Sequence, residues 1–383
     1  MPRPDDSTGA SRLPSLTGAR FIAAALVFSF HFAYQFPFAS PSVGAAYSHA
    51  VSMAGSLGVA FFFVLSGFVL TWTAKPGEPA RLFWRRRVVK IYPNHLVTLV
   101  LTVGLMFWAG TAPTFAEAIP NALLVHAWIP HADIFLGMND VTWTLSCEML
   151  FYLSFPLLHR LVSRVSPRRL WALAAGVVAG MVAVSLISYL LPAQPQSFGV
   201  PTWRVWFVYI LPATRLLDFV LGIVVARIVL SGKWIRLGML PAALLVAMGY
   251  WVTLRIPQNF GWVAVCAAPL ALFIAAAASA DIEGRRSILR GRVMVWLGEV
   301  SFAFYLVHNL VLAYGHRALG ATRVWSTPEA AALGLLAFGV SILAAWLLYR
   351  FVEVPMMRRF ARPRNGRTAG RQAAEPGLAK ASA

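Results

Sequence analysis

The segment Arg20-Phe-Ile-Ala-Ala-Ala-Leu-Val-Phe-Ser-Phe-His31 is an apolar run with one ionisable side chain at each end. In a helix, eleven positions at about 100° each make almost a whole number of turns. Arg20 and His31 then lie on one face, separated axially by roughly 16 Å. This spacing predicts an arginine at a membrane surface and an imidazole near the middle of the bilayer. Because an ionisable group at that depth is costly unless it lines a cavity or a reaction path, the segment predicts a functional site inside a membrane protein.

The composition of the whole chain agrees with a membrane protein. Hydrophobic residues make up 59% of the 383 residues and charged residues 12%, and the mean hydropathy is +0.68. In soluble domains, charged residues make up roughly a quarter of the chain. The apolar runs are roughly 18 to 25 residues long and lack the alternation of a transmembrane barrel. We therefore predict an all-α fold, a polytopic bundle of transmembrane helices.

Hydropathy predicts ten spans, and an even number puts both termini on the same side of the membrane. Residues 116–130 are also apolar, but Pro120 and Pro130 bracket only a short helix there. That length favours an interfacial or re-entrant segment over an eleventh span. The ten spans are expected at about 20–38, 54–74, 91–110, 142–162, 169–192, 205–230, 237–254, 260–280, 294–314 and 329–352.

The positions of the basic residues give the orientation. With ten spans, 28 of the 33 Lys and Arg residues fall at the termini and in the loops on one side. The positive-inside rule puts that side in the cytoplasm and accounts for the net charge of +19 without a nucleic-acid partner. We expect a cytoplasmic segment at 1–19, a transmembrane domain at 20–357 and a basic, disordered cytoplasmic tail at 358–383. The tail is interpreted as a topology signal that also contacts anionic lipid.

The two cysteines do not predict a disulfide or a metal site. Cys147 and Cys266 both fall inside predicted spans, and no metal-ligand spacing accompanies them. Cys147 stands beside Glu148, but a small buried apolar residue is the better interpretation. The first 19 residues are polar and run directly into a full-length span, so we expect no cleaved secretory signal.

Several polar residues fall at similar depths in different spans. Glu148 is expected in the outer half of the fourth span. Ser301, Tyr305 and His308 follow at i, i+4 and i+7, which puts them on one face of the ninth span. His31, Glu148, Tyr305 and His308 are therefore candidates for a common site.

Other interpretations of such residues are structural. A single intramembrane histidine is often a hydrogen-bond partner between helices, which leaves the role of His308 open, and Ser301 fits a small packing residue. Arg215 and Asp218, at i and i+3, are expected to form a structural ion pair. Phe61-Phe62-Phe63 is predicted to face lipid and neighbouring helices, with Gly67 allowing one helix to approach closely.

The ordered motifs resemble those of the acyltransferase 3 family, integral membrane enzymes that acylate hydroxyl groups of glycans, lipids and secondary metabolites. The resemblance covers nearly the whole chain, and the family's ten spans with cytoplasmic termini agree with the charge analysis. The motifs are Leu16-Thr-Gly-Ala-Arg20 to His31, Phe61-Phe-Phe-Val-Leu-Ser-Gly-Phe68, Arg85-Arg-Arg-Val-Val-Lys-Ile-Tyr-Pro93, Trp143 to Glu148 with Phe151-Tyr152, Ser301-Phe-Ala-Phe-Tyr-Leu-Val-His308, and Glu353-Val-Pro355.

The resemblance implies an acyl-CoA donor, acetyl-CoA or another short acyl-CoA, used from the cytoplasm. It maps the family's essential Arg and His onto Arg20 and His31, and the Glu of the fourth-span motif onto Glu148. The family's Arg-x-x-Arg is here Arg87-Val-Val-Lys90, in which Lys keeps the charge but loses the bidentate fork. The role of His95, shortly after that motif, stays open.

Physical chemistry makes a donor site coherent with these positions. CoA is polyanionic at one end and neutral along its pantetheine arm, so basic residues are expected at the cytoplasmic face. The candidates are Arg20, Arg86, Arg87 and Lys90. The axial gap between Arg20 and His31 is about the length of the arm, so the acyl group would reach His31.

His31 is then expected to act as the general base on the acceptor hydroxyl, or to carry the acyl group transiently. Glu148 is expected to orient His31 or balance its charge, and Tyr305, His308 or Ser301 to contact the oxyanion or the substrate.

The expected acceptor is a hydroxyl of a sugar, glycan or glycosylated metabolite, because the chain resembles the high-GC bacterial branch that includes macrolide O-acyltransferases. The expected location is the plasma membrane, in contact with lipid and without a bound metal. A proton-coupled secondary transporter is the alternative, since intramembrane His, Glu and Arg–Asp groups also suit transport. A non-catalytic sensor on the same scaffold is a third possibility.

Overall fold

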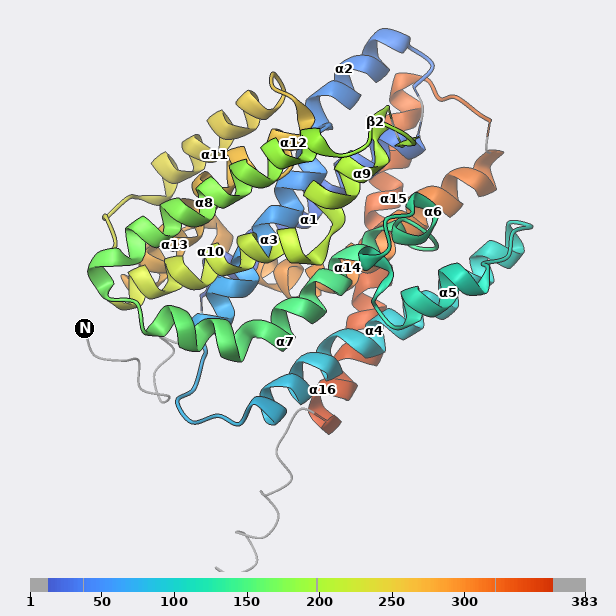
Figure 1. The fold of residues 1–383 in the computed structure, drawn as a ribbon. Coiled ribbons are helices and arrows are strands. Elements are labelled where there is room, and N and C mark those ends of the chain that lie inside the picture. Colours follow the sequence, from blue (N-terminus) through green and yellow to red (C-terminus); the bar gives the residue numbers. More distant parts are fainter. Residues whose placement is uncertain (1–12, 37, 198, 321, 361–383) are drawn as a thin grey trace, which may run out of the picture.

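A computed structural model describes residues 13–360 apart from 37, 198 and 321. Long helices run side by side through most of this part of the chain (Figure 1), and its one sheet is the hairpin β1–β2, in which Gln196 pairs with Pro201. The predicted all-α bundle is confirmed. The helices are α1 Pro14–Gln35, α2 Pro41–Val51, α3 Ala54–Trp72, α4 Ala80–Trp108, α5 Phe115–Ala122, α6 Ala132–Phe135, α7 Trp143–Ser163, α8 Leu170–Ile187, α9 Thr202–Val205, α10 Pro212–Leu230, α11 Met239–Thr253, α12 Gln258–Gly261, α13 Ala264–Ile282, α14 Arg292–Gly320, α15 Thr327–Leu348 and α16 Val354–Phe360.

Shorter elements connect these helices. The strands are β1 Gln196–Ser197 and β2 Val200–Pro201. The chain also contains five 3₁₀ turns and two π-helical turns within the described residues. One π turn lies just before α10 and the other directly before α16. They are the 3₁₀ turns η2 His126–Trp128, η3 Asp140–Thr142, η4 Pro167–Arg169, η5 Ser188–Leu190 and η7 Ile288–Arg290, and the π turns η6 Trp206–Ile210 and η8 Tyr349–Glu353.

Every predicted span contains a long helix, although two of these helices are atypical. Eight helical segments of the described chain are long and apolar enough to cross a membrane. The remaining two predicted spans correspond to α10, which carries Arg215, Asp218 and Arg227, and to α11, which has 15 residues. At 1.5 Å per residue α11 is shorter than a typical hydrocarbon core of roughly 30 Å.

Helix α1 begins at Pro14, six residues before the predicted edge of the first span, and so extends into the predicted 1–19 segment. The N-terminal part of α1 and the helix α16 lie towards the same end of the bundle (Figure 1), as an even number of crossings requires. Within the predicted tail, residues 358–360 belong to α16. The rest of the tail, 361–383, lies outside the described residues.

The apolar segment 116–130 does not cross the bundle. It forms α5 and η2, and the Trp206 indole donates to the Ala127 carbonyl at 3.0 Å, which fastens the segment to the turn η6 before α10. Inside it, His126 is buried within hydrogen-bonding distance of the Thr142 and Ser146 hydroxyls. Burial, with a contribution from nearby His95, lowers the pKa of His126 to about 4. This imidazole is therefore a neutral structural group at physiological pH.

His95, whose role the sequence left open, also joins structural elements. Its Nε2 lies 2.9 Å from the Asn121 carbonyl oxygen, so it links α4 to α5. It is fully buried.

Helix α3 lies at the centre of the bundle, between α1, α10 and α13. Phe61 and Phe63 are 4% and 1% exposed, so for both residues the predicted contact with lipid is wrong and the predicted contact with neighbouring helices is correct. The reason is that α3 has neighbours on nearly all sides, which a uniformly apolar helix does not reveal. The predicted close approach at Gly67 is confirmed: a methyl group there would collide with the Phe219 carbonyl of α10, and one on Gly222 would collide with the Val64 carbonyl of α3.

The substitution Gly67→Ala is expected to destabilise the protein by about 1–3 kcal/mol, because the added methyl group forces two backbones apart. Thermal unfolding of the purified protein measures the loss. Gly104→Ala on α4 is the control, since nothing lies within 4 Å of a methyl group there. Equal midpoints for the two variants would contradict the close contact.

The predicted ion pair on α10 is also present. Arg215 Nε lies 3.3 Å from Asp218 Oδ2, and both side chains are buried. The guanidinium also donates to the Trp262 carbonyl at 3.4 Å and lies over the Phe63 ring. These contacts join α10 to α3 and to the segment before α13.

Candidate active site

Basic residues of α4 gather at the end of the bundle where α1 begins. Arg86 forms an ion pair with Glu78 in the preceding loop, and the Arg87 guanidinium lies 5.4 Å from the Phe83 ring centre and 5.9 Å from that of Tyr152. Arg87 thus points towards α7, while Arg86 is engaged at the rim.

Lys90 points towards the last helical turns of the chain. Its Nζ lies 3.4 Å from Oε1 of Glu353, and the Asn94 amide donates to Oε2 at 2.8 Å. Glu353 is 5% exposed and ends the π-helical turn η8, whose wider turn brings this carboxylate against α4. Lys90, predicted as a donor-binding residue, is therefore paired with a carboxylate in this state.

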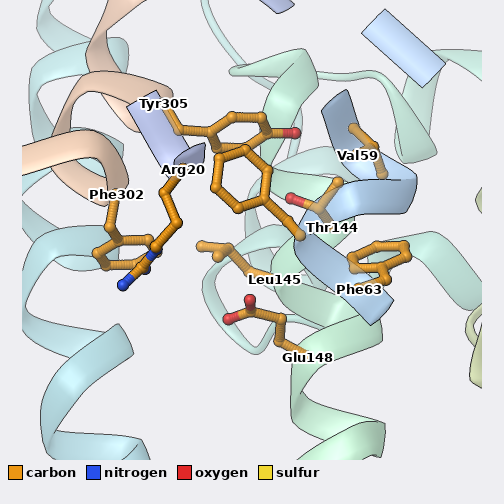
Figure 2. Close-up of a pocket in the computed structure, with 9 residues that line it drawn as sticks. Arg20, Val59, Phe63, Thr144, Leu145, Glu148, Phe302 and Tyr305 are labelled. Carbon is orange, nitrogen blue, oxygen red and sulfur yellow. The ribbon is translucent and has the colours of Figure 1, made fainter. Parts of the chain in front are cut away.

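A small pocket extends inwards from this basic end. Its volume is about 40 Å³, enough for a few water molecules. Figure 2 shows the charged ends of Arg20 and Glu148 on one side of the pocket, with the Tyr305 ring across from them. Tyr152 donates to Glu148 Oε2 at 3.2 Å. The lining residues are Arg20 of α1, Val59, Phe62 and Phe63 of α3, Thr144, Leu145 and Glu148 of α7, and Phe302 and Tyr305 of α14.

Two histidines meet further along α1 and α14. His31 Nδ1 lies 3.1 Å from His308 Nε2, and the ring centres are 5.1 Å apart. The Asp140 carboxylate, in η3, approaches from the other side, with Oδ2 at 4.0 Å from His31 Nε2. Asn309 donates to Oδ1 of the same carboxylate at 2.6 Å. We refer to His31, His308, Asp140 and Asn309 as the histidine cluster.

Hydrogen bonds define the neutral forms of both rings. His308 Nδ1 lies 2.8 Å from the Tyr305 carbonyl and 3.2 Å from that of Phe304, so Nδ1 carries the proton and Nε2 is an acceptor. His31 Nδ1 faces this acceptor and the Val27 carbonyl at 3.0 Å, so it is also the protonated nitrogen. The lone pair of His31 is then on Nε2, on the side of Asp140. This arrangement can accept a proton at Nε2 and stabilise the resulting cation.

The structure brings some of the predicted site residues together and separates others. His31 and His308 are in contact, whereas Glu148 lies in the pocket beside Arg20 and bonds to Tyr152. The carboxylate against His31 belongs to Asp140, about two helical turns before Glu148 along the chain, so the expectation that Glu148 orients His31 is corrected.

The two remaining candidates on α14 differ in their surroundings. Tyr305 lines the pocket and its hydroxyl donates to the Val141 carbonyl at 3.3 Å. Ser301 is buried and donates to the Gly298 carbonyl of its own helix at 2.7 Å. It is not among the residues that line the pocket, which favours the packing interpretation.

Sequence reasoning missed Asp140 and Asn309. Asp140 stands two residues before the predicted start of the fourth span and looked like a loop residue. Asn309 follows His308 directly, and only the structure shows that the helix carries it towards the same carboxylate.

Comparison with protein families gives one match across most of the chain. Residues 13–350 match the family model described as an acyltransferase domain. No solved structure matches the chain significantly.

Comparison with characterised proteins gives relatives from several bacteria. The chain is 45% identical to acyltransferase MdmB of Streptomyces mycarofaciens over 94% of this chain and 95% of that protein. It is 26% identical to the exopolysaccharide production protein ExoZ of Rhizobium meliloti, over 80% of this chain and 90% of that protein. It is 25% identical to O-acetyltransferase OatA of Staphylococcus aureus, over 80% of this chain and 53% of that protein.

Proposed function

Because the chain belongs to the acyltransferase family whose domain it matches over residues 13–350, we propose that it transfers a short acyl group, such as acetyl, from acyl-CoA to a hydroxyl group. The proposed acceptor is a sugar, a glycan or a glycosylated metabolite such as a macrolide, and the proposed location of this multi-pass membrane protein is the plasma membrane. The observation that carries the proposal is the His31 imidazole, whose free Nε2 faces Asp140 and which lies on the same helix as Arg20, a residue that lines the pocket.

Binding of the donor from the cytoplasm is supported by the charge at one end of that pocket. Arg20 and Arg87 offer guanidinium groups to phosphates, and guanidinium groups bind phosphate bidentately. Lys90 and Arg86 would have to exchange their carboxylate partners, Glu353 and Glu78, for phosphate oxygens. The basic end therefore suits the polyanionic part of CoA.

The pocket must widen before a pantetheine arm can enter, since about 40 Å³ is far less than such an arm occupies. Its walls include the aromatic side chains of Phe62 and Phe302, which can rotate about their side-chain bonds. The axial distance of roughly 16 Å between Arg20 and His31 then matches the reach of the arm.

In the proposed reaction, His31 Nε2 accepts the proton of the acceptor hydroxyl as its oxygen attacks the thioester carbonyl carbon. A carbon–oxygen bond forms, the carbon–sulfur bond breaks, and the CoA thiolate takes the proton back from His31. Tyr305 would stabilise the developing oxyanion with its hydroxyl, whereas His308, whose single N–H is bonded to backbone carbonyls, would hold His31 in place. In the alternative sequence, the acyl group first bonds to His31 and then passes to the acceptor, and the overall balance is the same.

Transfer of the acyl group to an oxygen atom is supported by the names of the relatives. The relative with 45% identity over nearly the full length comes from Streptomyces and is an acyltransferase, and a more distant one is an O-acetyltransferase. These names support transfer to oxygen.

The test is acetyl transfer by the purified full-length protein in lipid nanodiscs, with radiolabelled acetyl-CoA and a panel of sugars and macrolides. We expect a labelled acceptor and one free CoA thiol for each transfer. Arg87→Gln is expected to raise KM for acetyl-CoA about 10- to 100-fold, the value of a charged hydrogen bond, and to leave KM for acetyl-pantetheine unchanged.

Arg81→Gln is the matched control, because Arg81 is exposed at the start of the same helix. If Arg87→Gln impairs both donors equally, Arg87 does not bind the nucleotide end. If no acceptor is labelled and proteoliposomes instead show proton-coupled uptake, the transporter alternative replaces the proposed function.

A further inference from the structure

Asp140 is the one carboxylate that the structure records against the His31 imidazole within the described residues. The separation of 4.0 Å from Nε2 is too long for a hydrogen bond to the neutral ring, and it is within ion-pair distance of the protonated ring. The position matters because Nε2 is the nitrogen that carries the lone pair. Asp140 thus faces the reacting atom, whereas His308 faces Nδ1.

Two asparagines hold this carboxylate and its turn in place. Asn309 donates to Asp140 Oδ1 at 2.6 Å, which leaves Oδ2 directed towards His31. Asn139, the preceding residue, is buried and donates to the Leu306 carbonyl of α14 at 2.9 Å. Both bonds tie η3 to α14, the helix that supplies His308.

The Asp140 side chain is 34% exposed, in contrast to Asn139 at 2%. The Asp140 carboxylate thus lies beside the free nitrogen of a histidine whose side chain is 15% exposed, where a small molecule can reach it.

We propose that Asp140, held by Asn309, is a positioning residue that balances the positive charge that His31 acquires when it takes the acceptor proton. The inference rests on the proposed function and adds a residue to it. Charge balance at 4 Å favours the state in which the acceptor oxygen attacks, because the new imidazolium and the carboxylate attract each other. The residues proposed to bind the phosphates, Arg20 and Arg87, are not in contact with Asp140, so donor binding is expected to be independent of it.

The test compares Asp140→Ala, Asp140→Asn and Asp140→Glu in the full-length protein, using acetyl-CoA turnover. Asp140→Ala and Asp140→Asn are expected to lower kcat about 10- to 100-fold, the range for removing a carboxylate that supports a functional histidine. KM for acetyl-CoA should stay unchanged. Asp140→Glu should keep more activity than Asp140→Asn, although Asn is closer in size to Asp, because it retains the charge.

Chemical rescue separates charge balance from a merely structural role. Added formate is expected to restore part of kcat in Asp140→Ala, because the small anion can occupy the vacated position. Asp133→Ala is the matched control: Asp133 is exposed in the preceding α6, and its substitution should change neither kcat nor the response to formate.

Two results would overturn the inference: Asp140→Asn with wild-type kcat, or a loss in Asp140→Ala that formate leaves unchanged while Asp140→Glu is as impaired as Asp140→Asn. Neither result touches the proposed function, which fails only if the wild type transfers no acyl group or His31 variants remain active. Asn309→Ala provides an independent check, with a smaller loss of kcat expected since the carboxylate remains but is less well held.

Discussion

The substitution His31→Gln is expected to lower kcat for acyl transfer by about 10²- to 10⁴-fold, the usual contribution of a general base. Gln can keep a hydrogen bond towards His308, but it cannot accept a proton at the position of Nε2. KM for acetyl-CoA should change little, because Arg20, which is proposed to bind phosphate, lies roughly 16 Å away at the other end of the helix face. Steady-state turnover in nanodiscs, with donor binding measured separately by calorimetry, gives both quantities.

The matched control is His49→Gln, a histidine of α2 on the surface of the bundle. This variant should have the same kcat for acyl transfer as the wild type. Full activity in His31→Gln would remove His31 from the reaction and support a non-catalytic role for the histidine cluster. A stable labelled protein that accumulates when the acceptor is omitted, and is absent in His31→Gln, would identify the route through an acylated histidine.

The substitution Arg215→Leu is expected to destabilise the protein by about 3–5 kcal/mol, because it leaves the Asp218 carboxylate buried without its partner. Such a loss removes a large share of the stability of an ordinary domain. It should appear as a much lower midpoint of thermal unfolding and as poor recovery from membranes. The double variant Arg215→Met with Asp218→Leu should regain most of the loss, because it removes both buried charges. If the single and double variants were equally stable, the unpaired Asp218 carboxylate would not be the cause of the destabilisation.

The helices could be predicted from the sequence because the bilayer imposes a strong rule. A segment in hydrocarbon must satisfy its own backbone hydrogen bonds, so length and apolarity identify a spanning helix with little help from tertiary contacts. Helix α11 has only 15 residues and is close to the lower limit of this rule. It can still be predicted from the sequence, because charged loops flank its apolar residues. The same reasoning correctly kept segment 116–130 out of the count, because its prolines limit the helices it can form.

The environment of each helix face was harder to predict. Contact with lipid was predicted for Phe61 and Phe63, but both side chains are buried because other helices enclose α3. An apolar side chain suits a lipid neighbour and a protein neighbour equally well, because hydrocarbon tails are as apolar as leucine. Sequence reasoning therefore finds spans more readily than it finds which of them is central.

In the candidate site, too, some residues could be predicted from the sequence and others could not. Spacing on a single helix predicted that Arg20 and His31 share a face, and similar depth predicted the meeting of His31 with His308. Asp140 could not be found in this way, because it reaches His31 through a 3₁₀ turn held by contacts to α14 about 170 positions away along the chain. The partner of a site residue is thus the part that only the fold provides.

The contact between Gly67 and Gly222 also bears on how the pocket can change its volume. Two backbones in direct contact offer no side chain that could adopt another rotamer, so α3 and α10 move together or not at all. The pocket wall formed by Val59, Phe62 and Phe63 belongs to α3 and therefore has a fixed base. Enlargement must come from rotation of the aromatic rings or from displacement of the other helices that line the pocket, α1, α7 and α14. Because the α3 side of the cavity is rigid, a long substrate can enter only if the remaining walls of the cavity move.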